Sequence, residues 1–255
     1  MSFSRTAPAD LRLSQEQATQ LRTFAGGLRE NPQFIPIKDA DRAWWGTKGV
    51  DVPTGDLDRK RLFELGCDLE DDDALLRFTF HVLAWGSGSS RRHNAVRVAS
   101  LKDPGARSRF GEGTNRETLR KAFRAAGASA DAPTSSWPRK ARIRDAYCTL
   151  IRPGGGVIAG LGPAFFTKLL YFAGNSESPS CLILDARVAK SLDRLGWQMS
   201  PRHGSFSYNW YTDTYVSYCE LLHQWATRDL GREVRADEIE QWLFEGCPAG
   251  EGQTS

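Results

Sequence analysis

Cysteine is scarce in this sequence, and its spacing excludes two common uses of the residue. Five cysteines occur in 255 residues. They are widely scattered, and no two of them form a Cys-x-x-Cys pair. A zinc ribbon needs such pairs, and an odd, dispersed set argues against a disulfide framework. We therefore expect reduced and mostly buried thiols at the five positions, which are Cys67, Cys148, Cys181, Cys219 and Cys247.

Long hydrophobic runs are also missing. No apolar run approaches the roughly 20 residues that a membrane span requires, and the N-terminal residues lack the apolar core of a signal peptide. The balance of 40% hydrophobic and 25% charged residues is typical of a folded soluble protein rather than a disordered chain. We expect a cytoplasmic protein whose length allows one large domain or two closely packed lobes.

The charge is low overall but unevenly distributed. The whole chain carries +3, yet residues 88–152 contain fifteen Lys/Arg and five Asp/Glu, which gives this span +10 and leaves −7 for the remainder. A basic middle on a slightly acidic body is what a phosphate-binding face requires, although an arginine-rich solvated surface gives the same count. Arg91 and Arg92, near the start of the span, are candidates for contacts to a DNA backbone.

Alternating strand patterns are nearly absent, and helical periodicity predominates. The apolar run 181–184 is ambiguous, since it fits a strand or a buried connection. Ser14 is placed to cap the first helix, and the acidic residues 71–73 supply the N-terminal charge of another. We predict an all-α fold, with one helical domain over residues 1–255. The predicted helices span residues 14–30, 56–65, 71–83, 93–101, 114–126, 139–151, 163–172, 185–195, 213–230 and 236–244.

A glycine-rich turn followed by an apolar helix, residues 157–172, is the most informative segment. Gly160 and Gly162 permit a tight backbone path and leave no side chain to block a phosphate. Pro163 suits the first turn of a helix, where its missing N–H costs nothing. The amides at that helix start form an anion site. Many helix junctions share this pattern, so the turn alone is weak evidence for phosphate binding.

Two charged residues follow the turn at positions that suit catalysis. Lys168 lies among phenylalanines and leucines, where an ammonium group is costly unless it reaches a cleft; there, a partly desolvated amine is a nucleophile. A lysine that extends to solvent from an amphipathic helix is the alternative. Asp185 comes 17 residues later, directly after an apolar run. Its carboxylate suits the cap of the next helix, and it is our candidate partner for the lysine.

Residues 157–192 resemble the helix-hairpin-helix signature of the DNA glycosylase superfamily, especially its 8-oxoguanine glycosylase branch. That family pairs a hairpin lysine with an aspartate at the start of the following helix. The run 160–163 matches the hairpin and the run 184–188 matches the aspartate segment. The string 165–172 is similar to a group of bacterial proteins with this fold, some of them associated with defence against phages that carry hypermodified cytosine. Lys168 lies about one helical turn later than the lysine of the best-known branch, and one turn returns a side chain to nearly the same face.

The resemblance implies two helical lobes with an active-site cleft between them, and a glycosylase mechanism. The target nucleotide is flipped out of the duplex. Lys168 attacks the anomeric carbon and forms a Schiff base, while Asp185 stabilises the positive charge on the sugar. The implied partner is double-stranded DNA containing a modified base, bound by a monomer. No metal or redox cofactor is required, and the family implies that hairpin carbonyls can hold a monovalent cation.

Aromatic residues provide candidates for the base pocket. Eight tryptophans are many for this length, and aromatic planes beside polar turns suit a flipped base. Aromatic residues also fill cores, so each candidate is open to both interpretations. The candidates, which we expect near turns rather than in the middle of helices, are Trp44, Trp45, Trp85, Tyr208 and Trp210.

The substrate and the class of function each leave alternatives. The narrower bacterial group implies glucosylated hydroxymethylcytosine in phage DNA, and the broad family implies 8-oxoguanine. We favour the phage base because the displaced lysine and its surrounding string set this chain apart. A non-catalytic DNA-binding module would tolerate arginine in place of Lys168, and a helical interaction protein would show no salt-dependent DNA binding.

Overall fold

The computed structural model describes residues 4–30, 37–52, 57–87, 94–110, 113–127, 139–153, 155–199 and 210–246. These residues form eleven α-helices, one five-residue π-helix and a two-stranded sheet, so the predicted all-α fold is confirmed. The chain divides into two compact units. The central unit is Gln33–Cys181, and the terminal unit combines Met1–Pro32 with Leu182–Ser255.

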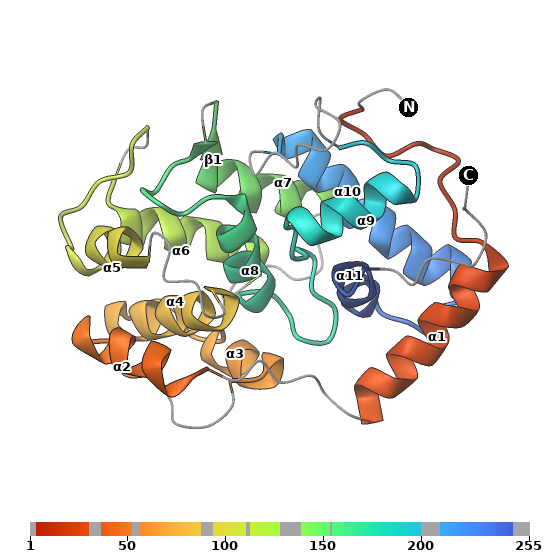
Figure 1. The fold of residues 1–255 in the computed structure, drawn as a ribbon. Coiled ribbons are helices and arrows are strands. Elements are labelled where there is room, and N and C mark those ends of the chain that lie inside the picture. The colour runs from red at the N-terminus through yellow and green to blue at the C-terminus, as the bar shows by residue number, and fades with distance from the viewer. Residues whose placement is uncertain are drawn as a thin grey trace. The chain divides into compact units, whose positions relative to one another are not determined.

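The central unit is built around one apolar helix, α8, which contacts α3, α4, α6 and α7 (Figure 1). Its residues Phe166 to Phe172 are all buried, and a helix that is apolar on every side belongs in a core. The elements of this unit are α2 (Asp39–Thr47), α3 (Arg59–Leu65), α4 (Asp72–Ser87), α5 (Asn94–Lys102), α6 (Asn115–Ala126), α7 (Arg139–Leu150), β1 (Ile151–Arg152), β2 (Gly155–Gly156) and α8 (Pro163–Phe172).

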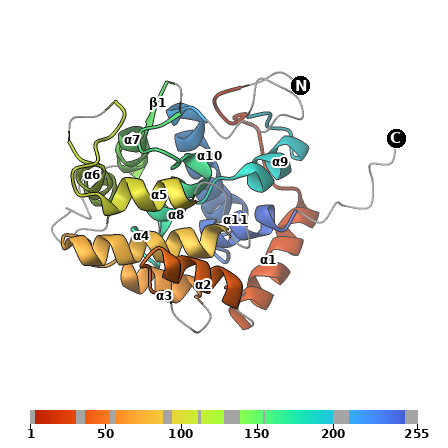
Figure 2. The same ribbon diagram turned by 60° about the vertical axis from the view of Figure 1, so that its left-hand side comes forward.

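Helix α4 supplies much of the core that surrounds α8, and the two helices lie side by side in Figures 1 and 2. Edge-on aromatic pairs join α4 to its neighbours: Phe78 lies 5.5 Å from Phe123 of α6, and Trp85 lies 5.1 Å from Phe172 of α8, between ring centroids. Such pairs add to the free energy of burial. At Gly66, a β-carbon would lie 2.2 Å from the carbonyl oxygen of Phe172, so a glycine is needed for this approach.

Several arginines of the basic span are already paired within the central unit. Arg116 and Arg120 of α6 both form ion pairs with Asp72 at the start of α4, and Arg124 pairs with Glu70. Hydrogen bonds from Arg120 and then Arg116 hold the pKa of Asp72 below its ordinary value. Because these carboxylates lie outside residues 88–152, the basic surface open to phosphates is smaller than the charge count predicts.

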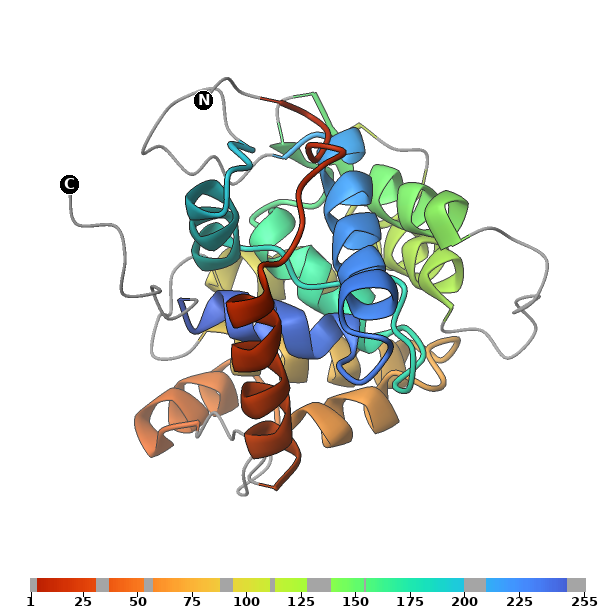
Figure 3. The ribbon, with the colours of Figure 1, turned by 90° about the vertical axis from the view of Figure 1, so that its right-hand side faces the viewer.

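The terminal unit joins the two ends of the sequence. Figure 3 shows α1 crossing in front of α11, and the two helices are in contact. Arg29 of α1 donates two hydrogen bonds of 2.7 Å to the carboxylate of Glu238 on α11, which raises the pKa of Arg29. The elements of this unit are α1 (Gln15–Glu30), α9 (Ala186–Arg194), α10 (Thr212–Gln224), the π-helix η1 (Trp225–Asp229) and α11 (Ala236–Phe244).

Local capping chemistry predicts several helix ends correctly. The hydroxyl of Ser14 accepts the Gln17 amide at 3.1 Å, and Asp71 accepts the Ala74 amide at 2.9 Å. The helices predicted over 163–172 and 236–244 have these bounds. The helix predicted over 139–151 ends one residue earlier, because Ile151 begins β1.

Three of the candidate tryptophans lie in the last turn of a helix, near its end rather than in its middle, as predicted. Trp44 and Trp45 lie in the last turn of α2, a helix that the sequence did not predict, and Trp85 lies in the last turn of α4. Helix α2 is only nine residues long and has a glycine near its end, which makes it difficult to recognise from sequence. Burial of Trp45 against Phe80, with ring centroids 6.5 Å apart, anchors it.

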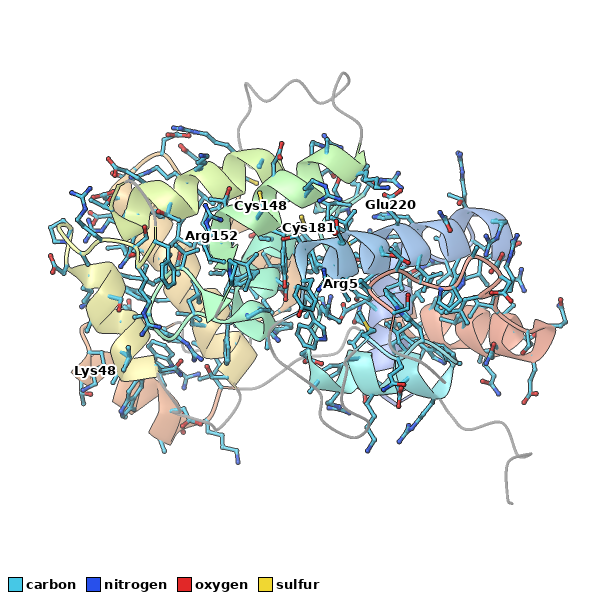
Figure 4. The ribbon with its side chains drawn as sticks, turned by 90° about the horizontal axis from the view of Figure 1, so that it is seen from above. Arg5, Lys48, Cys148, Arg152, Cys181 and Glu220 are labelled. Atoms are coloured by element: carbon cyan, nitrogen blue, oxygen red, sulfur yellow. The ribbon has the colours of Figure 1, made fainter. Side chains whose placement is uncertain are left out.

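Not all of the described cysteines are buried as expected. Cys181 and Cys219 are buried, Cys148 is half-buried and Cys67 is exposed; Cys247 lies outside the described residues. Burial raises the pKa of the Cys148 thiol, which makes it a poor nucleophile. Figure 4 shows Cys148 on α7.

Among the helices of the described ranges, none has the length and apolar character to cross a membrane.

Candidate active site

A tight loop, residues 157–162, connects β2 to α8; we call it the glycine loop. At Gly156, just before it, a β-carbon would lie 2.2 Å from the Leu161 carbonyl oxygen, so the chain can fold back only over a glycine. Gly160 has φ +75°, a left-handed conformation that a β-carbon disfavours. The Leu161 amide closes the turn by donating to the Ile158 carbonyl at 3.1 Å. Local sequence therefore determines the loop.

The loop ends at the start of α8, as the sequence predicts. Gly162 is the N-cap and Pro163 the first helical residue. The Phe165 and Phe166 amides both donate to the Gly162 carbonyl, whereas the Gly162 and Ala164 amides precede the helical ladder and are the groups that a helix start offers to an anion. Gly162 has an ordinary φ of −85°, and nothing lies within 4 Å of where its β-carbon would stand. The fold does not require a glycine here.

The side chain of Lys168 is buried in the central unit and does not extend to solvent. Only 8% of the residue is exposed, and its Nζ donates to the Ala164 carbonyl at 2.7 Å. The side chain thus runs back one turn, toward the glycine loop, and brings the amine to the first turn of α8. At Gly86, a β-carbon would lie 2.7 Å from Lys168 Cδ, so this glycine makes room for the lysine stem.

Arg97 of α5 contacts the glycine loop and was missed by the sequence analysis. Its Nε donates to the Gly160 carbonyl at 2.7 Å, and its guanidinium carbon lies 3.6 Å from the ring centroid of Phe165. The same side chain donates to Asn94 Oδ1. Arg97 is only 3% exposed, and desolvation lowers its pKa to about 10.

A signal for Arg97 was present in the sequence. Helical spacing puts Asn94, Arg97, Val98 and Leu101 on one face of α5, and all four are buried. Two polar residues on an otherwise apolar face indicate a buried polar contact. The periodicity identified the helix, but the charge was counted as part of a basic surface.

Asp185 caps α9 in the terminal unit, as predicted. Its Oδ1 accepts the Arg187 amide at 2.9 Å and the Val188 amide at 3.2 Å. The backbone just before it is held by two buried hydroxyl groups of α10: Tyr215 donates to the Leu182 carbonyl at 2.8 Å, and Tyr218 donates to the Ile183 carbonyl at 2.6 Å. The position of Asp185 within its unit is therefore fixed by the first amides of α9 after it and by the α10 tyrosines that bind the backbone before it.

The base-pocket candidates differ in how much of each ring is exposed. Trp45, Trp85 and Trp210 are buried at 2%, 6% and 2% exposure. Trp44 is half-buried, and Lys48 Nζ lies over its ring, 5.6 Å from the centroid. Tyr208 lies outside the described residues.

Basic residues lie beside the glycine loop, whereas the predicted backbone contacts Arg91 and Arg92 fall outside the described residues. Arg109 is exposed, and its amide donates to the Val157 carbonyl at 2.9 Å. Arg152 is exposed on β1, immediately beyond α7 (Figure 4), and its guanidinium donates to the Cys148 carbonyl. The Arg109 backbone thus adjoins the start of the loop, whereas the Arg152 guanidinium is held at the end of α7. Over the described ranges, no three His, Cys, Asp or Glu side chains are grouped to hold a metal ion.

Comparison with known proteins gives one match. A family model described as "Putative 8-oxoguanine DNA glycosylase OGG-like protein" matches residues 36–244, which is most of the chain. Searches of curated proteins and of solved structures found no significant match. The match spans the glycine loop, Lys168 and Asp185, and it implies DNA as the partner and supports DNA glycosylase activity. The chain belongs to the OGG-like family of DNA glycosylases.

Proposed function

We propose that this protein flips a modified base out of double-stranded DNA and excises it, with Lys168 as the nucleophile and Asp185 as its carboxylate partner. The observation that carries the proposal is the burial of Lys168. Its amine donates to the Ala164 carbonyl in the first turn of α8, which directly follows the glycine loop. A buried ammonium in an apolar helix is costly, which favours a functional reason for the residue. The family resemblance supports the role of Asp185.

The chemistry proceeds through a covalent intermediate. The neutral amine of Lys168 attacks the anomeric carbon, and the glycosidic C–N bond breaks, so that the base leaves with the bonding electrons and takes up a proton. Opening of the sugar ring then gives the Schiff base, and loss of the 3′ phosphate by β-elimination gives lyase activity. Asp185 stabilises the positive charge on the sugar and receives the proton from the lysine.

The glycine loop is proposed to grip the phosphate backbone. The Gly162 and Ala164 amides supply donors at the α8 start, and Arg109 and Arg152 supply charge; Arg91 and Arg92 remain proposed contacts from the sequence.

A monovalent cation at the loop is compatible with the carbonyls there, although four of the six already accept bonds within the protein. The Ile158 carbonyl accepts the Leu161 amide, the Gly160 carbonyl accepts Arg97, and the Val157 and Gly162 carbonyls accept backbone amides. A carbonyl oxygen has two lone pairs, so the loop carbonyls could still hold such an ion, which would add positive charge beside a phosphate. Arg97 already places one positive charge on this loop.

Replacing Gly162 with alanine is expected to weaken DNA binding about tenfold without destabilising the fold. The added methyl group has room within the protein, but it stands beside the amides that the phosphate must approach. Salt-dependent binding to a DNA duplex, measured by fluorescence anisotropy, checks this result. Gly160→Ala is the contrasting variant: its φ of +75° makes the substitution strained, at roughly 1 kcal/mol, so its melting temperature should fall. Unchanged binding by Gly162→Ala would remove the loop from the DNA interface.

We propose that the base pocket includes Trp44, whose ring is accessible, with Trp45, Trp85, Tyr208 and Trp210 as the further candidates. For the substrate we propose glucosylated hydroxymethylcytosine in phage DNA, which would give the protein a role in antiphage defence. The support is the string 165–172 and the position of Lys168, which distinguish this chain from the oxidised-guanine enzymes. Repair of 8-oxoguanine is the alternative that the family description favours.

Base release from defined duplexes tests the function and the substrate together. The protein is incubated with duplexes that contain glucosylated hydroxymethylcytosine, 8-oxoguanine or only ordinary bases, and free bases are measured by mass spectrometry. We expect release of the glucosylated base alone. Release of 8-oxoguanine would establish a repair glycosylase instead. Tight binding without any release would establish a non-catalytic DNA-binding module.

A further inference from the structure

We propose that Arg97 is a positioning residue for the catalytic helix: it fixes the Gly160 carbonyl and the first turn of α8, and thereby places the amine of Lys168. The enzymatic consequence rests on the proposed function. The structural part rests only on contacts within the central unit.

The contacts of Arg97 use different parts of a rigid group. Nε donates to the Gly160 carbonyl at 2.7 Å, and a terminal nitrogen donates to Asn94 Oδ1 at 2.5 Å. The face of the guanidinium lies over Phe165, with its carbon 3.6 Å from the ring centroid. Because the group is planar, donors within the plane and a ring on its face fix its position and tilt together. Arg97 thus joins the loop to the helix that follows it.

The position of the Lys168 amine depends on these contacts between Arg97, the glycine loop and α8. Phe165 lies three residues before Lys168, and so on the same side of α8, and Lys168 Nζ is 5.7 Å from the Phe165 ring centroid. The amine also donates to Ala164, the neighbour of Phe165. A shift in the first turn of α8 would move both contacts. A misplacement of roughly 1 Å is enough to lower a catalytic rate by about 100-fold.

The hydrogen bonds of Arg97 continue through Asn94 to the end of α4. Asn94, which accepts from Arg97, donates its amide to the Ser87 hydroxyl at 2.9 Å. Ser87 follows Gly86, the glycine against which the Lys168 stem packs. Arg97 therefore connects the loop with the end of α4 as well as with α8, and these are two of the surfaces that surround the lysine.

Stability alone does not account for an arginine at this position. The residue is 3% exposed, and burial of the cation lowers its pKa to about 10, which shows that the folded state disfavours the charge. An apolar side chain of similar length would fill the space with less desolvation. An apolar residue would lack the N–H donors that bind the Gly160 carbonyl and Asn94 Oδ1.

The test compares Arg97→Met and Arg97→Lys with a matched control, Arg116→Met. Arg116 also lies in the central unit, and its guanidinium donates to the Leu101 and Lys102 carbonyls at the end of α5 and to the Asp72 carboxylate, rather than to the glycine loop. Hydrogen exchange of the amides from residue 157 to residue 168 is measured first. Base release at saturating DNA and the dissociation constant for DNA are measured next.

We expect faster exchange in the glycine loop and the first turn of α8 for both Arg97 variants, and a rate of base release lowered about 10- to 100-fold per folded molecule. Lysine should not restore the rate, because it keeps the positive charge but lacks the planar guanidinium with its several N–H donors. Arg116→Met should lower the melting temperature and leave the loop and the rate unchanged. Unchanged exchange in the loop, or full rescue by lysine, would overturn the proposal. If the wild-type protein released no base from any duplex, the proposed function would fail, and the exchange result would still decide the role of Arg97.

Discussion

Replacing Lys168 with glutamine is expected to lower base release by about 10³-fold or more. Glutamine is one bond shorter than lysine and keeps N–H donors for the region of the Ala164 carbonyl, to which the Lys168 amine donates at 2.7 Å, but it has no amine to attack the sugar. The fold should tolerate the change, since a buried ammonium is replaced by a neutral amide. Single-turnover base release at saturating DNA measures the effect.

Lys121→Gln is the matched control for this variant. Lys121 is exposed on α6 in the same unit, so its substitution removes the same charge and should leave the rate unchanged. DNA binding by Lys168→Gln should stay within a few fold of the wild-type value, because the glycine loop is intact. Base release at the wild-type rate by Lys168→Gln would show that water or another group is the nucleophile.

Replacing Asp185 with asparagine is expected to lower base release by roughly 10²- to 10³-fold while the melting temperature changes little. Asparagine is as good an N-cap as aspartate, so it can accept the Arg187 and Val188 amides that Asp185 now accepts. What it lacks is the negative charge that stabilises the developing cation on the sugar. Thermal unfolding and single-turnover rates, measured on the same samples, separate the two roles.

Alanine substitutions at two caps calibrate this separation. Asp185→Ala removes cap and charge together and should cost about 1 kcal/mol of stability as well as the rate. Asp58→Ala removes the cap of α3, where Asp58 accepts the Arg61 amide at 2.7 Å, and should reduce stability by a similar amount with no effect on the rate. A wild-type rate for Asp185→Asn would limit Asp185 to its structural role.

Features that depend on a few neighbouring residues could be predicted from the sequence. The left-handed turn at Gly160, the helix start at Pro163 and the cap at Asp185 each follow from the conformational preference of one residue type. The apolar string after Pro163 defines α8 to the residue. The candidate nucleophile was found in the same way, because a lysine in that string is an anomaly in a local pattern.

Features that depend on distant contacts could not be predicted. The terminal unit joins α1 to α11 through Arg29 and Glu238, which are more than 200 residues apart in sequence, and local periodicity carries no information about such pairs. Arg97 appeared to be surface charge because its partner, Gly160, lies 63 residues away. Helix α2 was missed because it has only nine residues and because its anchor, the burial of Trp45 against Phe80, is a contact with a distant part of the sequence.

The central claim is that Lys168 forms the covalent bond to DNA, and trapping with borohydride tests it most directly. The protein is mixed with the duplex from which it releases a base, borohydride is added to reduce the Schiff base, and the adduct is digested and mapped by mass spectrometry. We predict that the sugar is attached to Lys168 and to no other amine. An adduct on another lysine or on the N-terminal amine, or base release with no adduct at all, would contradict the mechanism proposed for this protein.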